Sequence, residues 1–200
     1  MNTTSASSRR ARWLVAGTAA LALPTLAFAH TGVGHTHGFL AGAGHPVLGL
    51  DHVCAMIAVG LWAAQRGGRA IWAVPATFVL VMAMGGALGV AGVNLPLVEP
   101  GIVGSVFILG LLIAAAVRLP VVASALIVGL FAIFHGFAHG AEMPASGSGL
   151  AYGAGFMVVT AALHLCGIGL AMLMAKVGSE RVVRYAGGAI AACGVVLCFL

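Results

Sequence analysis

Charged residues are scarce in this sequence: Asp and Glu number 4, Lys and Arg number 9, and together they make up 6% of the 200 residues. Hydrophobic residues make up 62%, and the mean hydropathy is +1.13. A soluble domain of this length has too little interior to bury so many apolar side chains, so the composition is typical of a membrane protein that crosses the bilayer several times. No basic run suited to nucleic acid is present.

Sequence motifs of several enzyme classes are also missing. The chain has no G-x-x-x-x-G-K-[ST] loop for nucleotide phosphates and no H-E-x-x-H zinc motif. Its four cysteines all lie inside apolar segments, where a disulfide framework is not expected. We therefore expect a protein that is not an enzyme, has no organic cofactor and cannot hydrolyse ATP itself.

Residues 1–29 have the pattern of a cleaved secretory signal peptide. Arginines precede an apolar stretch over residues 13–23, and Ala27-Phe28-Ala29 forms an A-x-A cleavage site. An uncleaved first anchor is the alternative. Cleavage predicts a mature protein that starts outside the bacterial inner membrane.

The segment after the predicted cleavage site, residues 30–44, is rich in histidine and glycine. We interpret His30, His35 and His37 as a flexible external segment that captures a divalent cation, because short histidine-rich tracts bind metals. A polar leader with incidental histidines is the alternative.

A single transmembrane domain is predicted over residues 45–200, as a six-helix, all-α bundle. Most of the six apolar segments reach the roughly 20 residues that span a bilayer. The six segments are 45–64, 70–92, 100–117, 119–139, 149–175 and 181–200. Every basic residue after the signal lies in loops on one side: Arg66, Arg69, Arg118, Lys176, Arg181 and Arg184. The positive-inside rule therefore predicts that both mature termini lie outside, in the periplasm.

Two stripes of metal-binding side chains occur in this apolar background. On a helix, His45, Gly49 and His52 (i, i+4, i+7) share a face, with Asp51 one position away and Pro46 suited to the first turn. In the predicted fourth helix, His135, His139 and Glu142 have the same spacing. Both stripes are predicted in the outer half of the membrane. We therefore predict one metal site, formed by His45, Asp51, His52, His135, His139 and Glu142, between the first and fourth helices.

Asp51 is the sharpest single clue, because a carboxylate at a helix centre costs about 2.5–3.5 kcal/mol to insert and no membrane-embedded Lys or Arg is available to pair with it. Protonation, a partner histidine or a bound cation can offset that cost; a position in an aqueous vestibule is the alternative. His164, in the middle of the fifth segment, is interpreted as a relay site on the way inward. A buried histidine bonded to a neighbouring helix is the other reading.

The two stripes resemble the signatures of a known family. His45-Pro46-x-x-Gly49-x-Asp51-His52 and Phe134-His135-Gly136-x-Ala138-His139-Gly140-x-Glu142 are similar to motifs of the HupE/UreJ proteins. These small membrane proteins have a signal peptide and six spans and are taken to be nickel or cobalt permeases associated with hydrogenase or urease. The resemblance implies Ni²⁺ (or Co²⁺) as the transported ion. It also implies metalloenzyme supply as the purpose, with downstream metallochaperones as partners.

The leading hypothesis is thus an inner-membrane importer of Ni²⁺ or Co²⁺ with a passive or secondary mechanism. A membrane metalloenzyme, a metal-binding accessory or sensor protein, and a haem-binding bundle are the alternatives. The sequence leaves open the choice between nickel and cobalt, the coupling mechanism, the need for partner subunits and whether the chain forms a homo-oligomer.

Overall fold

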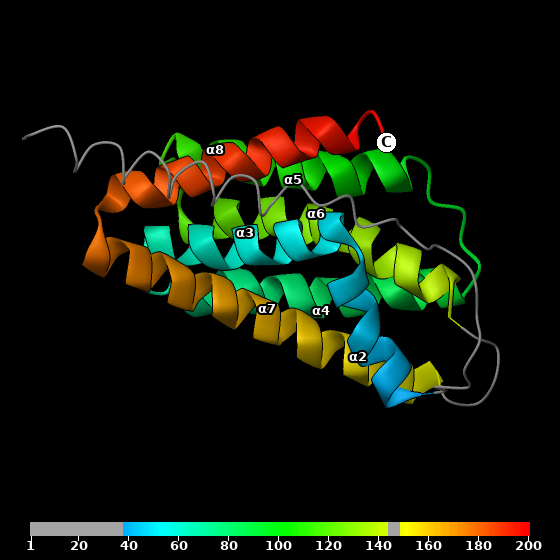
Figure 1. The fold of residues 1–200 in the computed structure, drawn as a ribbon. Helices are drawn as coiled ribbons and strands as arrows, with labels where there is room; N and C mark the ends of the chain where they lie inside the picture. Colours follow the sequence, from blue (N-terminus) through cyan, green and yellow to red (C-terminus); the bar gives the residue numbers. More distant parts are fainter. Residues whose placement is uncertain (1–37, 144–148) are drawn as a thin grey trace, which may run out of the picture. The chain divides into compact units, whose positions relative to one another are not determined.

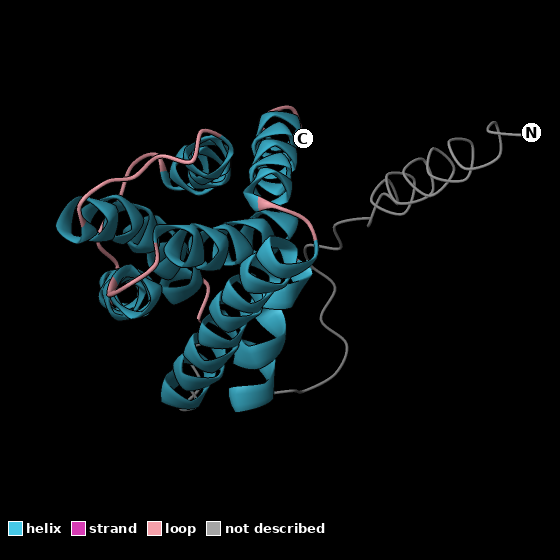
Figure 2. Ribbon diagram, turned by 90° about the vertical axis from the view of Figure 1, so that its left-hand side faces the viewer, coloured by secondary structure: helices cyan, strands magenta, loops and turns pink. Residues whose placement is uncertain are grey.

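A computed structural model of the chain describes residues 38–143 and 149–200. Within these two ranges the chain forms helices and connecting loops and no strand (Figure 1, Figure 2). The helices are α2 (Phe39–Leu48), α3 (Leu50–Arg66), α4 (Ala70–Val90), α5 (Val98–Ala114), α6 (Val121–Ala141), α7 (Gly149–Val177) and α8 (Glu180–Leu197). The all-α prediction is confirmed for this part of the chain. The predicted signal peptide and His30, His35 and His37 lie outside the described residues.

The length and composition of the helices support membrane spans. Helices α4, α6 and α7 are long and apolar enough to cross a bilayer, and α2 with α3 qualifies as a fourth span if the bent pair is counted as one. Helix α5 is apolar but shorter, and α8 starts with a charged turn. The described helices thus support three to four spans, and the count of six stays a prediction.

The first predicted span is two helices and not one. Helices α2 and α3 meet at 86°, because Gly49 has an extended backbone (φ −91°, ψ 119°) that ends one helix and begins the next. Pro46 lies inside α2, which begins at Phe39, and does not start a helix. The prediction that His45, Gly49 and His52 share a face of one continuous helix was therefore wrong. Asp51 is also not deep in a helix, since it lies in the first turn of α3.

Helix α3 is at the centre of the bundle. It contacts α2, α4, α5, α7 and α8, and its Met56 and Trp62 side chains are fully buried. Glycines let neighbouring backbones touch: Gly60 of α3 lies against the carbonyl of His164 in α7, and Gly136 of α6 lies against the backbone of α4. Small residues allow this close packing of membrane helices. The α3–α7 and α4–α6 pairs thereby fix the positions of the histidines that they carry.

Polar hydrogen bonds tie together the end of the bundle where α3 and α5 finish. Gln65 Nε2 donates to the carbonyl of Ile113 at 3.1 Å, and Arg184 Nε donates to the carbonyl of Ala114 at 2.8 Å. Arg66 donates to the carbonyl of Leu119. These donors satisfy carbonyls at the C-terminal end of α5 and beyond it, where positive charge also complements the helix dipole. We call this the basic end of the bundle.

Candidate metal centre

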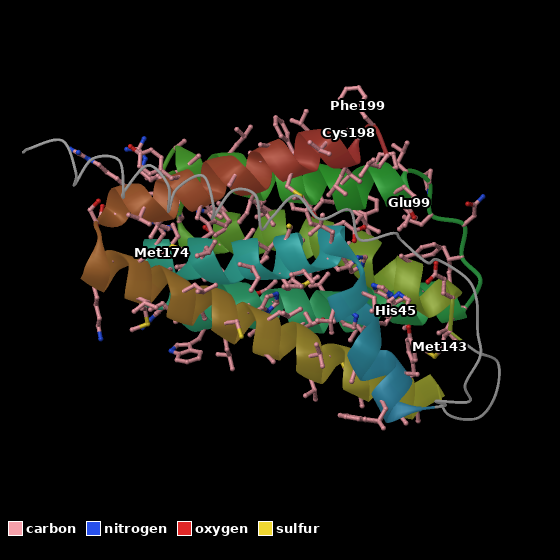
Figure 3. The ribbon with its side chains drawn as sticks, in the orientation of Figure 1. His45, Glu99, Met143, Met174, Cys198 and Phe199 are labelled. Atoms are coloured by element: carbon pink, nitrogen blue, oxygen red, sulfur yellow. The ribbon has the colours of Figure 1, made fainter. Side chains whose placement is uncertain are left out.

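The predicted ligands gather at the opposite end of the bundle, where α3 begins and α6 ends. They come from three helices: His45 from α2, Asp51 and His52 from α3, and His135 and His139 from α6, with Glu142 as the residue that caps α6. Three of the histidines, His52, His135 and His139, are buried; His45 and Asp51 are partly exposed and Glu142 is exposed. Figure 3 shows His45 and Met143 at this end and Met174 at the other. We call it the histidine end.

Gly49 makes room for the carboxylate that begins α3. A Cβ at this position would lie 2.7 Å from Asp51 Oδ1 and 3.2 Å from His52 Nδ1. In the space that glycine leaves, Asp51 Oδ1 accepts hydrogen bonds from the His52 backbone N at 2.7 Å and from the His52 ring Nδ1 at 2.9 Å. A carboxylate in the first turn is also favoured by the helix dipole. The break between α2 and α3 therefore positions Asp51 behind the His52 ring.

The tautomers of two histidines follow from these contacts. Because the ionised carboxylate can only accept, His52 carries its proton on Nδ1, and its Nε2 has a free lone pair. His52 Nε2 lies 2.6 Å from His139 Nε2, so His139 donates through Nε2. The remaining lone pair of His139 is on Nδ1, which is buried and has no hydrogen-bond partner among the described residues. His139 thus keeps one free ligand atom.

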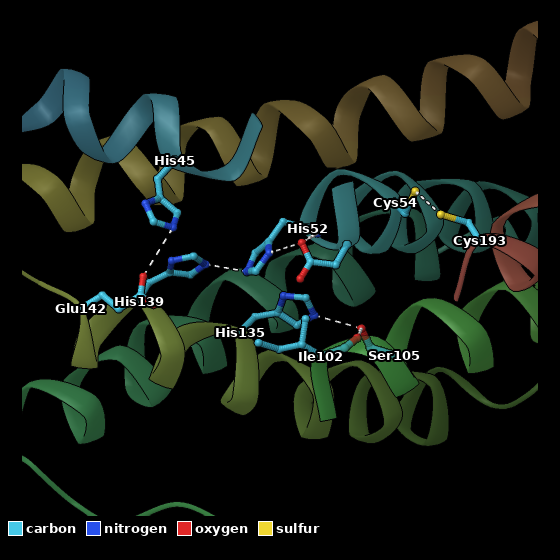
Figure 4. A network of polar contacts seen from close by, with 10 residues as sticks. His45, His52, Cys54, Ile102, Ser105, His135, His139, Glu142 and Cys193 are labelled. Carbon is cyan, nitrogen blue, oxygen red and sulfur yellow. Dashed lines mark hydrogen bonds and ion pairs between the residues drawn. The ribbon is translucent and has the colours of Figure 1, made fainter. Parts of the chain in front are cut away.

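His45, His139 and Glu142 form a cluster that can hold a metal ion. One ligand atom from each of these residues lies within 4.8 Å of the other two, and His45 Nε2 is 3.8 Å from Glu142 Oε2. Figure 4 shows His139 between His52 on one side and the His45–Glu142 pair on the other. Imidazole nitrogen and carboxylate oxygen together are donors for first-row divalent ions. The bend at Gly49 brings His45 to this cluster from a helix separate from that of His52.

His135 lies outside that three-residue cluster. Its ring packs edge-on against His52, with centroids 4.7 Å apart, and its Nε2 is 2.9 Å from Ser105 Oγ of α5. The spacing His135/His139 does place both imidazoles on the buried side of α6. The structure therefore arranges the predicted ligands in tiers, with His135 one turn further from the histidine end than His139.

Aromatic residues of α7 form one wall of the site. Phe156 packs against His139 with ring centroids 4.0 Å apart and planes tilted by 45°, and the Tyr152 ring centroid lies 6.2 Å from that of His45. Sequence reasoning missed both residues, and it also missed Ser105. The sequence gives only a weak indication that these residues belong to the site. Tyr152 and Phe156 are one helical turn apart, and Ser105 is a single hydroxyl residue in an apolar helix.

A cavity leads to the site between α4, α6 and α7. Its volume is about 890 Å³, and His139, Met143, Tyr152 and Phe156 are among its lining residues. Glycines and alanines form much of the remaining lining. The side chain of Glu142 is 59% exposed, so an ion that arrives from this end can meet the carboxylate before it reaches the buried imidazoles.

Comparison with known proteins gives one family. Residues 18–197 match the family described as HupE / UreJ protein. The protein described as Protein HupE of Rhizobium leguminosarum bv. viciae is 50% identical over 179 residues, which cover 90% of this chain and 93% of that protein. No solved structure matches the chain.

Proposed function

Because the chain belongs to the HupE/UreJ protein family, we propose that it imports Ni²⁺, or Co²⁺, across the bacterial inner membrane. The observation that carries this proposal is the cluster of His45, His139 and Glu142, whose ligand atoms lie within 4.8 Å of one another. Hydrogenase or urease metallochaperones inside the cell are the partners that the family resemblance implies.

The imidazole and carboxylate ligands suit Ni²⁺ or Co²⁺ in both ligand hardness and total charge. Neutral imidazole is a good ligand for nickel and cobalt, and a carboxylate adds the oxygen that an octahedral ion accepts. Asp51 and Glu142 together carry two negative charges, so a bound divalent ion leaves the site close to neutral. Neutrality matters here because an uncompensated charge is costly in the apolar part of a membrane.

The cluster can use the free Nδ1 of His139, whereas recruitment of His52 to the same ion as His139 Nε2 changes the contact between these two rings. Two nitrogens that share one ion at about 2.0–2.1 Å each lie roughly 2.8–3.4 Å apart for ligand angles near 90–109°. Their Nε2 atoms are 2.6 Å apart in this structure, so the rings must separate by less than about 1 Å and His139 must release its Nε2 proton or turn its ring. Asp51 would hold His52 in place during this change, as carboxylates behind metal-bound histidines do.

No ATP is needed for inward movement. A membrane potential that is negative inside favours entry of a divalent cation by about 4.6 kcal/mol per 100 mV, twice the value for one charge. The positive-inside pattern of the loops supports a topology in which the histidine end faces the periplasm and the basic end faces the cytoplasm. In this orientation the ion binds outside and leaves inside.

The test is uptake of radiolabelled nickel into proteoliposomes that hold the purified protein, with an inside-negative potential. Time-dependent accumulation that excess cobalt suppresses is expected, and it should be lost in His139→Ala but kept in Glu180→Gln, a substitution in the exposed first turn of α8. Stoichiometric nickel binding without accumulation contradicts transport by this chain alone and favours the accessory or sensor alternative. No binding contradicts the metal hypothesis.

A further inference from the structure

Two histidines beyond the cluster have ring nitrogens that nothing in the described part of the chain satisfies. His135 is 0% exposed and His164 is 1% exposed, and the unpartnered atoms are His135 Nδ1 and both ring nitrogens of His164. Buried polar atoms are nearly always hydrogen-bonded, because an unsatisfied one destabilises the fold. A pair of such residues therefore suggests a ligand that is bound for part of the time.

Ser105 fixes which nitrogen of His135 is free. Ser105 Oγ lies 2.6 Å from the carbonyl of Ile102 and gives its only proton to that oxygen. The hydroxyl must then accept from His135 Nε2, which is 2.9 Å away. His135 is thus neutral with its proton on Nε2, and the lone pair on Nδ1 is available to a metal ion. Ser105 is a positioning residue for this lone pair.

The two histidines continue a row of imidazoles that starts at the cluster. Ring centroids are 4.5 Å apart between His139 and His52 and 4.7 Å apart between His52 and His135. Phe78 of α4 then packs against both His135, at 5.6 Å, and His164, at 5.2 Å. One phenyl ring therefore contacts the two histidines whose nitrogens are unsatisfied.

Positions on two helices, α7 and α3, each give the distance of His164 from the level of His139 and His52 along the bundle. His164 lies eight residues beyond Phe156, which packs against His139, and this spacing corresponds to about 12 Å along α7. On α3, Gly60 lies against the His164 carbonyl, and Gly60 is eight residues beyond His52, again about 12 Å. Side chains lean toward the N-terminus of their helix, so the His164 ring leans from this depth back toward the histidine end.

Thr160 lies between these two levels of α7. It is one turn before His164 and one turn after Phe156, so the three share a face of the helix. Its side chain is 0% exposed, and its hydroxyl has no partner among the described residues. The stretch between the cluster and His164 therefore contains a further polar atom that an ion or its water can contact.

We propose that His135 and His164 form a second, deeper station for the divalent ion, with His135 Nδ1 and a His164 nitrogen as ligands. This inference rests on the proposed transport function and adds a step to it. The deeper station has two imidazoles and no carboxylate, so it holds a divalent cation less tightly than the cluster with Asp51 and Glu142. Weak intermediate binding is what passage requires, since an ion must leave each site that it enters.

The test compares His164→Phe with the wild type in two assays, nickel binding to detergent-solubilised protein at equilibrium and nickel uptake into proteoliposomes. Phenylalanine keeps an aromatic ring beside Phe78 and removes two unsatisfied nitrogens, so the thermal unfolding temperature should not fall. We expect nickel binding at the cluster to stay within about threefold of the wild type. We expect uptake to fall by at least about tenfold, because loss of even a group that supports a metal ligand costs about 10–100-fold and His164 is itself a ligand of the deeper station.

The outcomes separate this inference from the proposed function. Wild-type uptake by a folded His164→Phe protein overturns the deeper station and leaves the transport proposal standing. Loss of nickel binding as well as uptake in a folded variant overturns a station distinct from the cluster. Absence of uptake by the wild-type protein refutes the transport proposal, and with it the inference.

Ser105 gives a second variant in case His164→Phe does not fold. Ser105→Ala removes the group that holds the His135 tautomer, so uptake should fall several-fold while nickel binding at the cluster persists. Ser105→Thr keeps a hydroxyl and should restore uptake. Unchanged uptake in Ser105→Ala overturns the assignment of His135 Nδ1 as a ligand, and equal loss in both variants indicates a packing effect and overturns it too.

Discussion

Replacing Asp51 with asparagine removes the charge of this side chain and keeps its shape. In the wild type, Asp51 Oδ1 accepts from the His52 backbone N at 2.7 Å and from His52 Nδ1 at 2.9 Å. The amide oxygen of asparagine can make the same two contacts, but without a negative charge. His52 Nε2 becomes a poorer electron donor, and one of the two charges that offset a divalent ion is lost.

The expected loss of nickel affinity in Asp51→Asn follows from the position of Asp51 behind the His52 ring. Loss of a partner that orients a metal-bound histidine costs about 10–100-fold in metal affinity, which corresponds to about 1.4–2.7 kcal/mol. The side chain of Asp51 is 24% exposed, so water screens part of its charge. We therefore expect a loss toward the lower end of this range.

Nickel binding to the purified protein in detergent, measured by titration calorimetry, tests this expectation. The nickel Kd should rise about 10-fold or somewhat more in Asp51→Asn, with unchanged stoichiometry. The matched control is Glu180→Gln, which removes the same charge at the basic end, where the side chain is exposed; its Kd should equal that of the wild type. An Asp51→Asn protein that binds nickel with the wild-type Kd would falsify the assignment of His52 and Asp51 to the metal site.

Three further predictions concern the backbone and the packing of the bundle. Gly49→Ala places a methyl group 2.7 Å from Asp51 Oδ1, so the Asp51 carboxylate should turn away and the nickel Kd should rise toward that of Asp51→Asn. A wild-type nickel Kd in Gly49→Ala contradicts this steric argument. Cys54 Sγ of α3 and Cys193 Sγ of α8 are 3.7 Å apart, so diamide should oxidise them to a disulfide that peptide mass analysis detects. The Cys193→Ser variant should form no such cross-link. Failure of the folded wild type to cross-link contradicts the placement of α8. Gly60→Ala puts a methyl group into the backbone of α7 and should destabilise the fold by about 1–3 kcal/mol, seen as a lower Tm in detergent. Gly169→Ala, which meets nothing within 4 Å, should leave the Tm unchanged or higher, and equal Tm values for the two variants contradict the close approach of α3 and α7.

The sequence predicts the regular part of the fold well because the physical signal is local. Long apolar runs between short polar loops placed α4, α6 and α7 within two residues of their observed ends. The spacing of His135 and His139 correctly indicated that both imidazoles share the buried side of α6. Periodicity and the high cost of exposed polar groups in a membrane are enough for these inferences.

The bend before α3 was not predictable from periodicity. Gly49 and Pro46 both signal a break, yet either residue is also tolerated within a membrane helix. The structure adds a local contact that periodicity does not encode, since the Asp51 carboxylate occupies the space that a Cβ at position 49 would need. A hydrogen bond from the following residue, His52, holds that carboxylate there.

The missed residues share another cause. Ser105 contacts His135 across 30 positions of sequence, and Cys54 contacts Cys193 across 139. Neither pair has a spacing that a single sequence can reveal, since the packing of α5 and α8 on the rest of the bundle creates both. The same holds for Phe156 of α7, whose contact with His139 of α6 exists only in the folded bundle.

The two ends of the bundle differ in a way that bears on the proposed transport. At the histidine end, the cavity of about 890 Å³ reaches His139. Toward the basic end, the side chains of Val59, Trp62 and Val74 are all 0% exposed, and hydrogen bonds from Gln65, Arg66 and Arg184 tie the helix ends together. A site that is open to one side and sealed from the other is what alternating access requires of one of its states. Release of the ion on the other side must separate α3 from α5 and from the loop that follows it, so the hydrogen bonds from Gln65 and Arg66 must break. Water can replace these two bonds more readily than the backbone contacts of α3 with α7. The Arg184 bond joins α8 to α5 and stays intact when these helices move together. We therefore expect the basic end to open by displacement of α5 and α8, with α3 and α7 moving as one unit.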